Sequence, residues 1–305
     1  MFNEDIKMRY IKYKTDNVVV DKYYLPNTFS NAEKFEMDLG KDLCNFTVKE
    51  IENMYRTLDF YSYETLLNVN SIFSQYTMWC INEGLVSDSQ NHYMEFDRPR
   101  LLNMVNNTML SQRVVDRETI IKWCQELPNP SDAFLLLGFF EGIRNLEFGD
   151  IKRNDININN NAIYLKERDK EIIFSNTLCN YGIISSNLDT YSSLSGAMVH
   201  SVKFIESGKV IKDYPNCDEI PTEKQVKQRI RNRMSRIFKY LGINDYTSTT
   251  SIRDSGIIEF INREKKMLRI NAEEYINQYS DRIKHQYNIT LRKYLFLDKY
   301  RQYLE

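Results

Sequence analysis

GFFEGIRNLEFGDI, residues 138–151, joins an apolar helix to a short charged segment. The helix is expected to begin near Ser131 and to end at Gly142, because glycine is favoured just past a helix end. Arg144 and Glu147 follow at once. A planar guanidinium can bridge two phosphate oxygens and stabilise the charge that develops in phosphoryl transfer. The simpler alternative is that Arg144 only pairs with Glu147 at i,i+3.

The composition around this segment is that of a globular chain. It has 305 residues, 42% of them hydrophobic and 27% charged, which favours two domains of ordinary size. We find no apolar run long enough to span a membrane and no secretory signal in MFNEDIKMRYIKYK, so a cytoplasmic location is expected. The net charge of −1 does not by itself suggest a nucleic-acid partner.

Cysteine and histidine usage argues against metal chemistry. The five cysteines lie far apart and show no paired metal-ligand spacing, so we expect reduced, mostly buried thiols at Cys44, Cys80, Cys124, Cys179 and Cys217. Three histidines leave little material for a zinc site or a Ser/His/Asp triad. No metal and no cofactor is expected.

The first third of the chain is predicted to be helical after an extended arm. Residues 1–30, with Val18 to Val20 and Pro26, favour that arm. Thr47 and Glu50 have capping-box spacing, and a second helix should run from Ser62 to Gly84. Further helix is expected from Pro99 to Leu110, which gives a small all-helical domain over residues 1–113.

The rest of the chain, residues 114–305, mixes helices with a hairpin. Asp116 should cap a helix that ends at Pro128. Ala162–Leu165 and Glu171–Phe174 have the pattern of two strands joined by a charged tip, residues 166–170. Helix returns from Thr222 to Tyr240 and again from Ile252 almost to the end. The predicted fold class is therefore mainly α with a small β-sheet (α+β).

The predicted helix from Thr222 to Tyr240 is unusually basic. It holds a single acid, Glu223, against seven cations, a density that suggests phosphate contacts, although a solvated helix face is an equally good explanation. The candidate DNA-binding residues are Lys224, Lys227, Arg229, Arg231, Arg233, Arg236 and Lys239.

Residues 138–151 resemble the first arginine box of the tyrosine recombinase (phage integrase) family. The resemblance implies that Arg144 is the first catalytic arginine and Glu147 the structural acid beside it. The hairpin follows where the family places one, and Lys166 falls where the family keeps a lysine that protonates the leaving 5′ oxygen, with Lys170 as a nearby substitute.

Residues 229–258, RIRNRMSRIFKYLGINDYTSTTSIRDSGII, resemble the family's basic helix, turn and His-x-x-Arg box. Arg253 then matches the second catalytic arginine, while Thr250 stands where the box has histidine. A threonine hydroxyl can hydrogen-bond but cannot exchange a proton near neutral pH, so proton transfer there should be lost. His285 precedes Tyr294 by nine residues, the family's spacing between its late His/Trp and its nucleophilic tyrosine.

The resemblance covers about residues 40–300 and implies a two-domain plan. Residues 1–113 would be a helical core-binding domain, with DLCNFTVKE…YTMW similar to the family's DNA-clamping bundle, and residues 114–305 a catalytic-like domain. Both domains are expected to clamp double-stranded DNA, with Arg144 and Arg253 holding one backbone phosphate.

Three hypotheses for function follow. The favoured one is a sequence-specific DNA-binding repressor on a degenerate recombinase scaffold, because the chain is similar to the integrase-like lytic-cycle repressors of SPbeta-like Bacillus phages. The second is an active recombinase that exchanges DNA strands through a phosphotyrosine intermediate. The third is a helical protein-interaction module, which the neutral charge permits. The expected partner is double-stranded DNA, at a phage operator or attachment-like site, and no membrane partner is expected. Self-association on DNA and a regulatory protein partner stay open.

Overall fold

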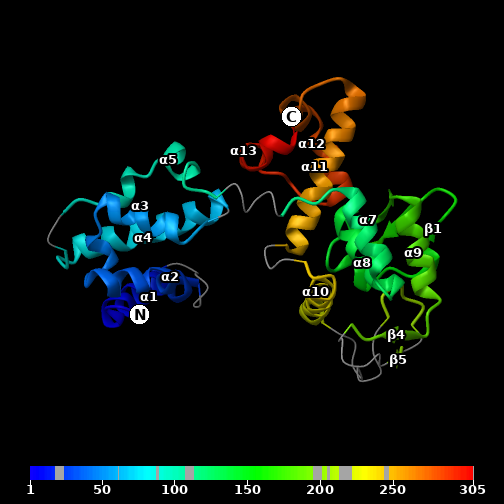
Figure 1. The fold of residues 1–305 in the computed structure, drawn as a ribbon, viewed down its shortest axis with the longest axis horizontal. Helices are drawn as coiled ribbons and strands as arrows, with labels where there is room; N and C mark the ends of the chain where they lie inside the picture. The colour runs from blue at the N-terminus through cyan, green and yellow to red at the C-terminus, as the bar shows by residue number, and fades with distance from the viewer. Residues whose placement is uncertain are drawn as a thin grey trace. The chain divides into compact units, whose positions relative to one another are not determined.

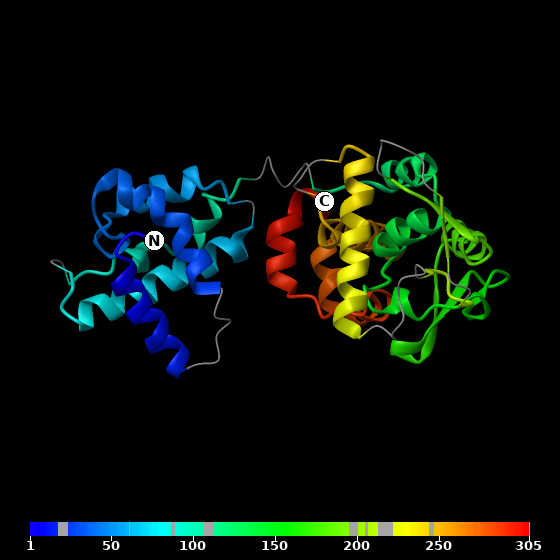
Figure 2. The same ribbon diagram turned by 90° about the horizontal axis from the view of Figure 1, so that it is seen from below.

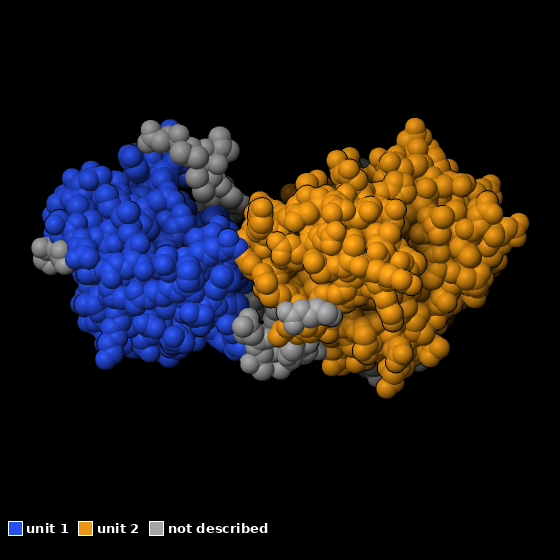
Figure 3. All heavy atoms as spheres, turned by 90° about the horizontal axis from the view of Figure 1, so that it is seen from above, with its two compact units in different colours: residues 1–110 blue, residues 111–305 orange. Residues whose placement is uncertain are grey.

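The structure, a computed structural model, describes residues 1–17, 24–60, 62–86, 89–106, 113–194, 201–204, 207–212, 222–243 and 247–304. The chain divides into two compact units, Met1–Leu110 and Ser111–Glu305, which we call the N-terminal and C-terminal units (Figures 1 and 3). Among the described residues, no helix combines the length and the apolar character that a membrane crossing requires.

The described part of the N-terminal unit is entirely helical. Its elements are α1 (Glu4–Asn17), α2 (Tyr24–Leu39), η1 (Leu43–Asn45), α3 (Val48–Thr57), α4 (Tyr63–Asn82), η2 (His92–Glu95) and α5 (Arg98–Leu102). The predicted capping box is confirmed, since the Thr47 main-chain N–H donates to Glu50 Oε2 at 2.7 Å and Glu50 N–H donates to Thr47 Oγ1. Ser62 caps α4, and Gly84 follows that helix in the left-handed region with φ 68°.

Two expectations for this unit are wrong. The extended arm of residues 1–30 is helical where it is described, because α1 and α2 bury Tyr10, Leu25 and Phe29 in the core; Val18 to Val20 lie outside the described residues. Pro26 sits in the first turn of α2, where a missing N–H costs nothing. The helix expected from Pro99 to Leu110 ends at Leu102, and residues 107–110 lie outside the described part.

Aromatic rings build the core of the N-terminal unit. The Tyr76 ring meets the rings of Tyr10 and Phe29 edge to face, at centroid distances of 5.2 and 5.1 Å. Beside them lies a buried ion pair that the sequence did not reveal, in which Lys7 Nζ donates to both carboxylate oxygens of Glu36 at 2.5 and 2.6 Å. Burial raises the pKa of Glu36 even though Lys7 opposes the shift.

The C-terminal unit combines helices with two small sheets. Its helices are α7 (Arg117–Glu126), α8 (Pro130–Glu141), α9 (Asn176–Ser186), α10 (Glu223–Tyr240), α11 (Thr249–Leu268), α12 (Ala272–Tyr287) and α13 (Lys293–Leu304). Figure 2 shows α10, in yellow, as one uninterrupted helix. Its strands are β1 (Ile156–Asn157), β2 (Ala162–Leu165), β3 (Lys170–Ile173), β4 (Thr190–Ser192) and β5 (Ser201–Lys203), with short 3-10 helices η3 (Glu147–Gly149), η4 (Arg153–Asp155) and η5 (Lys166–Arg168).

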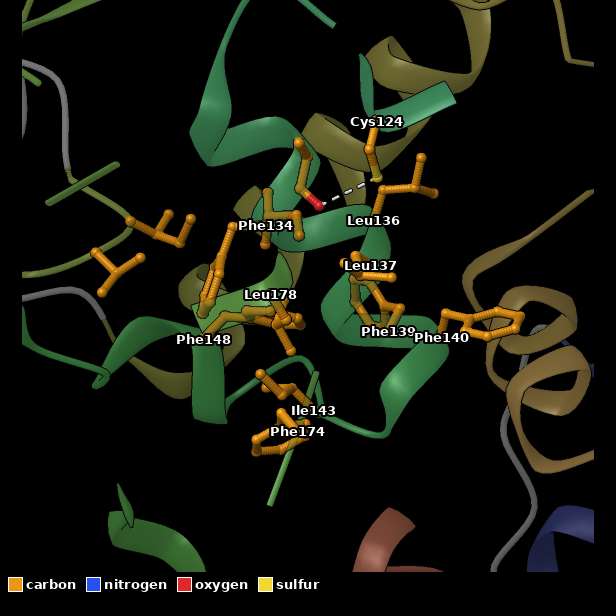
Figure 4. Close-up of a cluster of buried hydrophobic side chains, with 14 of the residues drawn as sticks. Cys124, Phe134, Leu136, Leu137, Phe139, Phe140, Ile143, Phe148, Phe174 and Leu178 are labelled. Atoms are coloured by element: carbon orange, nitrogen blue, oxygen red, sulfur yellow. Dashed lines mark hydrogen bonds between the residues drawn. The ribbon is translucent and has the colours of Figure 1, made fainter. Parts of the chain in front are cut away.

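Helix α8 is the centre of this unit and is buried along its whole length from Ser131 to Glu141. Figure 4 shows its apolar side chains gathered with those of Phe148 and Leu178, and Phe139 lies 4.9 Å from Phe148 between ring centroids. The Cys124 thiol lies 3.6 Å from the Ala133 carbonyl oxygen. Helices α7, α9 and α11 all pack on α8, so the segment after Gly142 leaves a rigid support.

The predicted hairpin is present. Strand β2 has the expected bounds, and β3 begins one residue earlier than expected; Ala162 pairs with Ile173 and Leu165 with Lys170 in an antiparallel register. Strands β1, β4 and β5 were not predicted, because two or three residues carry no measurable alternation. The prediction of reduced, buried cysteines is confirmed for Cys44, Cys80, Cys124 and Cys179, and Cys217 lies outside the described residues.

Candidate functional site

A cavity of about 280 Å³ opens in the C-terminal unit where four segments meet: the turn after α8, the hairpin tip, the first half of α10 and the first turn of α11. It brings together both arginines and the threonine that the sequence singled out, and adds two cations of α10. The lining residues are Phe139, Ile143, Arg144, Asn145, Leu146, Glu167, Lys227, Arg231, Thr249, Thr250 and Arg253. We call this cavity the arginine pocket.

Arg144 reaches the pocket because the chain reverses at Gly142. That glycine has φ 111°, and a side-chain Cβ there would lie 2.5 Å from the carbonyl oxygen of Gln286, so no other residue fits the turn. The Arg144 side chain is exposed, and its guanidinium donates one long hydrogen bond of 3.4 Å to the Asn288 carbonyl oxygen. Most of its donors therefore remain available for a ligand.

The simple alternative, a side-chain pair between Arg144 and Glu147, is not what the structure contains. The Glu147 carboxylate accepts the main-chain N–H of Arg144 at 2.7 Å, and its charge is matched by Arg168. Arg168 Nε and Nη2 donate to the two oxygens of Glu147 at 2.6 and 2.7 Å. Glu147 thus shapes the turn around Arg144 and leaves the Arg144 guanidinium free of it.

Arg168 supports the site as a buried structural residue, and the sequence did not indicate it. Its side chain is 3% exposed although it belongs to the charged hairpin tip. Besides Glu147, it donates to the carbonyl oxygens of Gly142, His285 and Gln286 at 2.7, 3.1 and 2.9 Å. This arrangement, which we call the Arg168 latch, joins the hairpin tip to the end of α8 and the end of α12. No local sequence signal marks it, since the partners lie 21 to 118 residues away.

Arg253 enters the pocket from the start of the second turn of α11, and Ser248 caps that helix. Its side chain is 30% exposed and Nη2 lies 3.2 Å from Asp254 Oδ1. Its Nε is buried and has no hydrogen-bond partner among the described residues. An unmade hydrogen bond of this kind costs about 1–3 kcal/mol, and an anion in the pocket would remove that cost. The N-terminus of a long helix adds its own preference for negative charge.

Helix α10 supplies Lys227 and Arg231 to the pocket, four residues apart on one face. Lys224, Arg236 and Lys239 are also exposed, and Arg229 is partly buried. The prediction for Arg233 is wrong. Its side chain is buried and donates to Asp132 Oδ1 at 2.6 Å and to the Ser131 hydroxyl, and it stacks on the Tyr191 ring, so it belongs to the core.

Three of the candidate catalytic residues do not line the arginine pocket. Lys166 is exposed, and its neighbour Glu167 lines the pocket instead. His285 lies in the last turn of α12 with its side chain exposed, and it is its main-chain carbonyl that meets Arg168. Tyr294, near the start of α13, is 70% exposed.

Glu167 places an acid in a pocket of cations. Partial burial raises the pKa of its carboxyl, and the nearby charge of Glu147 raises it further, while Arg144 opposes the shift. Glu223 and Asp150 add to the repulsion at longer range. Among the described residues no cluster of three His, Cys, Asp or Glu side chains could hold a metal ion. The described pocket therefore has the chemistry of an anion site that contains one opposing carboxyl.

The near-neutral net charge conceals a difference between the two units. Residues 1–110 contain 16 acidic and 11 basic residues, whereas residues 111–305 contain 26 acidic and 30 basic residues. The excess of positive charge thus lies in the unit that holds the arginine pocket. The net charge of the whole chain therefore does not show how charge is distributed between the two units.

Comparisons with known proteins agree with this two-part organisation. Residues 1–82 match the family model described as "MrpR, N-terminal core-binding domain", and residues 114–304 match "MrpR, C-terminal catalytic domain". No curated protein matches the chain. Among solved structures, a lambda integrase dimer bound to a COC' core site is similar at 13% identity, covering 99% of this chain and 95% of that chain, with a TM-score of 0.43. XerA recombinase is similar at 12% identity, covering 99% of both chains, with a TM-score of 0.35.

Proposed function

The chain belongs to the MrpR family, with the two-domain architecture of tyrosine-recombinase-like proteins, and we propose that it is a sequence-specific DNA-binding repressor that holds DNA without cutting it. The observation that carries this proposal is the arginine pocket. Arg144, Lys227, Arg231 and Arg253 converge there from three helices or their ends. A backbone phosphate is the anion that such a group of cations suits on a duplex.

The buried Nε of Arg253 supports a phosphate as the ligand. A guanidinium edge offers two parallel N–H donors, and Nε belongs to that edge. A phosphate oxygen would satisfy the donor that the protein leaves without a partner. Arg144 also lines the pocket and has several donors available.

Two of the candidate catalytic positions argue against strand cleavage. Thr250 lines the pocket. By the resemblance it stands at the histidine of the recombinase box, and a threonine hydroxyl cannot take up and release a proton near neutral pH. Tyr294 is largely exposed and does not line the pocket. Holding a phosphate needs neither residue, so these positions support phosphate binding more strongly than strand breakage.

The distribution of charge supports the C-terminal unit as the source of most of the proposed DNA affinity. Each cation that neutralises a phosphate releases counterions and steepens the dependence of log K on log salt by about 0.9. The N-terminal unit, with its excess of acidic residues, is expected to contribute shape and base contacts more than charge.

A selection experiment tests the DNA-binding proposal. Duplexes that the full-length protein enriches from a random pool should share a sequence, and their affinity should fall steeply with salt. Arg144→Ala should weaken binding at least tenfold and reduce the salt slope by about one unit. Lys122→Ala removes a positive charge from the exposed face of α7, outside the pocket, and serves as the control. Enrichment of no sequence, or affinity that ignores salt, contradicts the proposal.

An active recombinase is the second candidate, favoured by the meeting of Arg144 and Arg253 in one pocket. Loss of one acid/base group costs about 10² to 10⁴ in rate and does not by itself abolish cleavage. Nicked suicide duplexes built on the selected sequence would trap any covalent intermediate. An adduct that survives denaturation and disappears in Tyr294→Phe would establish the recombinase; its absence supports the repressor.

The repressor role itself, in a prophage within a bacterial cytoplasm, needs a cellular test. A promoter that overlaps the selected sequence should be silenced by the wild-type protein. It should be released by Arg253→Ala at equal protein level, because that change removes a phosphate contact. Equal silencing by the variant would contradict the role given to the pocket.

A further inference from the structure

The last helix of the chain reaches the residue next to Arg253. Tyr300 of α13 is 3% exposed, and its hydroxyl donates a hydrogen bond of 2.7 Å to Asp254 Oδ2. Lys299 Nζ lies 3.7 Å from the same oxygen. The other oxygen of Asp254 faces Arg253 Nη2 at 3.2 Å. A continuous chain of polar contacts therefore joins α13 to an arginine of the pocket.

The way the Asp254 charge is divided matters for Arg253. A free carboxylate beside a guanidinium can take a bidentate pair, which would occupy the same N–H donors that a phosphate uses. Here Tyr300 and Lys299 hold Oδ2, and Arg253 meets only Oδ1 through a single nitrogen. The remaining donors of Arg253, the buried Nε among them, stay available to the pocket.

We infer that Tyr300 is a positioning residue for Arg253: by holding Asp254, it keeps that carboxylate from closing on the guanidinium and keeps Arg253 turned toward a DNA phosphate. The inference rests on the proposed DNA-binding function. Tyr300 itself touches no DNA in this scheme, because it is buried and acts only through Asp254.

The attachment of α13 makes this control specific. The end of the helix is fixed to α11, since Asn262 Nδ2 donates to the Tyr303 carbonyl oxygen at 2.7 Å and Lys265 Nζ donates to that of Leu304. These bonds, and the apolar burial of Phe296 and Leu297, hold α13 in place without the Tyr300 hydroxyl. Removing that one oxygen should alter Asp254 and leave the helix docked.

A double-mutant cycle tests the inference. Dissociation constants for the duplex that the wild-type protein selects from a random pool are measured for wild type, Tyr300→Phe, Arg253→Ala and the double variant. Tyr300→Phe should weaken binding about five- to tenfold, because the freed carboxylate competes with the phosphate for Arg253. In the Arg253→Ala background the same change should have almost no effect, since the residue it acts through is gone.

Two further variants keep the outcome unambiguous. Tyr303→Phe removes a hydroxyl from the same helix, away from Asp254, and should bind like wild type. Lys299→Met removes the other group that holds Oδ2, and should weaken binding in the same direction and only when Arg253 is present. It answers the question if Tyr300→Phe fails to fold.

These measurements test the positioning role of Tyr300 separately from the proposed DNA-binding function. If Arg253→Ala weakens binding while Tyr300→Phe and Lys299→Met match the wild type, the positioning role is refuted and the DNA-binding proposal stands. An equal loss with and without Arg253 also refutes it, because it shows a general structural effect. If the wild-type protein selects no duplex, the proposed function fails and the inference fails with it.

Discussion

Replacing Arg168 by methionine should lower the free energy of unfolding of the C-terminal unit by about 3–5 kcal/mol, the cost of leaving a buried charge without its partner. The Glu147 side chain is 1% exposed, and Arg168 supplies both of the side-chain donors that its carboxylate receives. Three main-chain carbonyl oxygens, those of Gly142, His285 and Gln286, lose a donor in the same step. Methionine keeps much of the side-chain volume, so the loss reports on polarity and charge.

The chain offers a clean probe for this measurement. It has two tryptophans, Trp79 in the N-terminal unit and Trp123 in the C-terminal unit. In a Trp79→Phe background, tryptophan fluorescence during urea unfolding follows the C-terminal unit alone, and linear extrapolation gives its stability. Lys166→Met, at the exposed end of the same hairpin tip, is the matched control and should change stability by no more than about 0.5 kcal/mol.

A second substitution distinguishes the cause. Glu147→Gln in the Arg168→Met background removes the stranded charge and should restore part of the lost stability, as neutral replacements of buried ion pairs do. A loss of less than about 1 kcal/mol in Arg168→Met, or no recovery in the double variant, would refute the idea that a buried charge pair holds the hairpin tip.

Three further predictions concern other parts of the chain. The raised pKa of Glu167 means that its carboxyl takes up a proton at a higher pH than usual, so DNA affinity should increase as the pH falls through that pKa. Glu167→Gln should bind DNA more tightly than the wild type at neutral pH. Its affinity, measured by fluorescence anisotropy, should no longer show this pH dependence. Gly256→Ala should destabilise the C-terminal unit in the urea assay, because a Cβ would overlap the carbonyl oxygen of Phe140, and unchanged stability would mean that α8 and α11 can separate at no cost. Lys7→Met should lower the free energy of unfolding of the N-terminal unit by about 3–5 kcal/mol, because it leaves the buried Glu36 carboxylate without its partner. If this loss of stability disappears at a pH below the raised pKa of Glu36, the charge of Glu36 is its source.

The sequence predicted the elements whose signals are local. The capping box at Thr47, the glycine stops at Gly84 and Gly142, and the hairpin strands all depend on residues within one or two turns of each other. Only the resemblance predicted that Arg144 and Arg253 lie in one pocket, because 109 positions separate them and no periodicity connects them.

The features that the sequence did not predict are mainly polar contacts between residues far apart in the chain. The density of cations in α10, seven basic residues among 18, predicts phosphate contacts for Arg233 as for the others. Arg233 instead lies on the buried face and pairs with Asp132, 101 residues earlier. Lys7 with Glu36, and Tyr300 with Asp254, are likewise hidden from local patterns. Buried charges pair with whatever residue the tertiary fold brings near, and that information is not contained in any window of the sequence.

The Arg168 latch and the cap of α11 show which atoms of positions 250 and 285 the fold depends on. It grips the main-chain carbonyl oxygen of residue 285, so the imidazole of His285 is not what the fold uses. The first turn of α11 is likewise capped by Ser248 and Ser251, while Thr250 takes no part in the cap. A change of the side chain at position 250 or 285 therefore breaks none of these described contacts. If the proposed function holds, such a scaffold keeps DNA binding when its cleavage chemistry is lost.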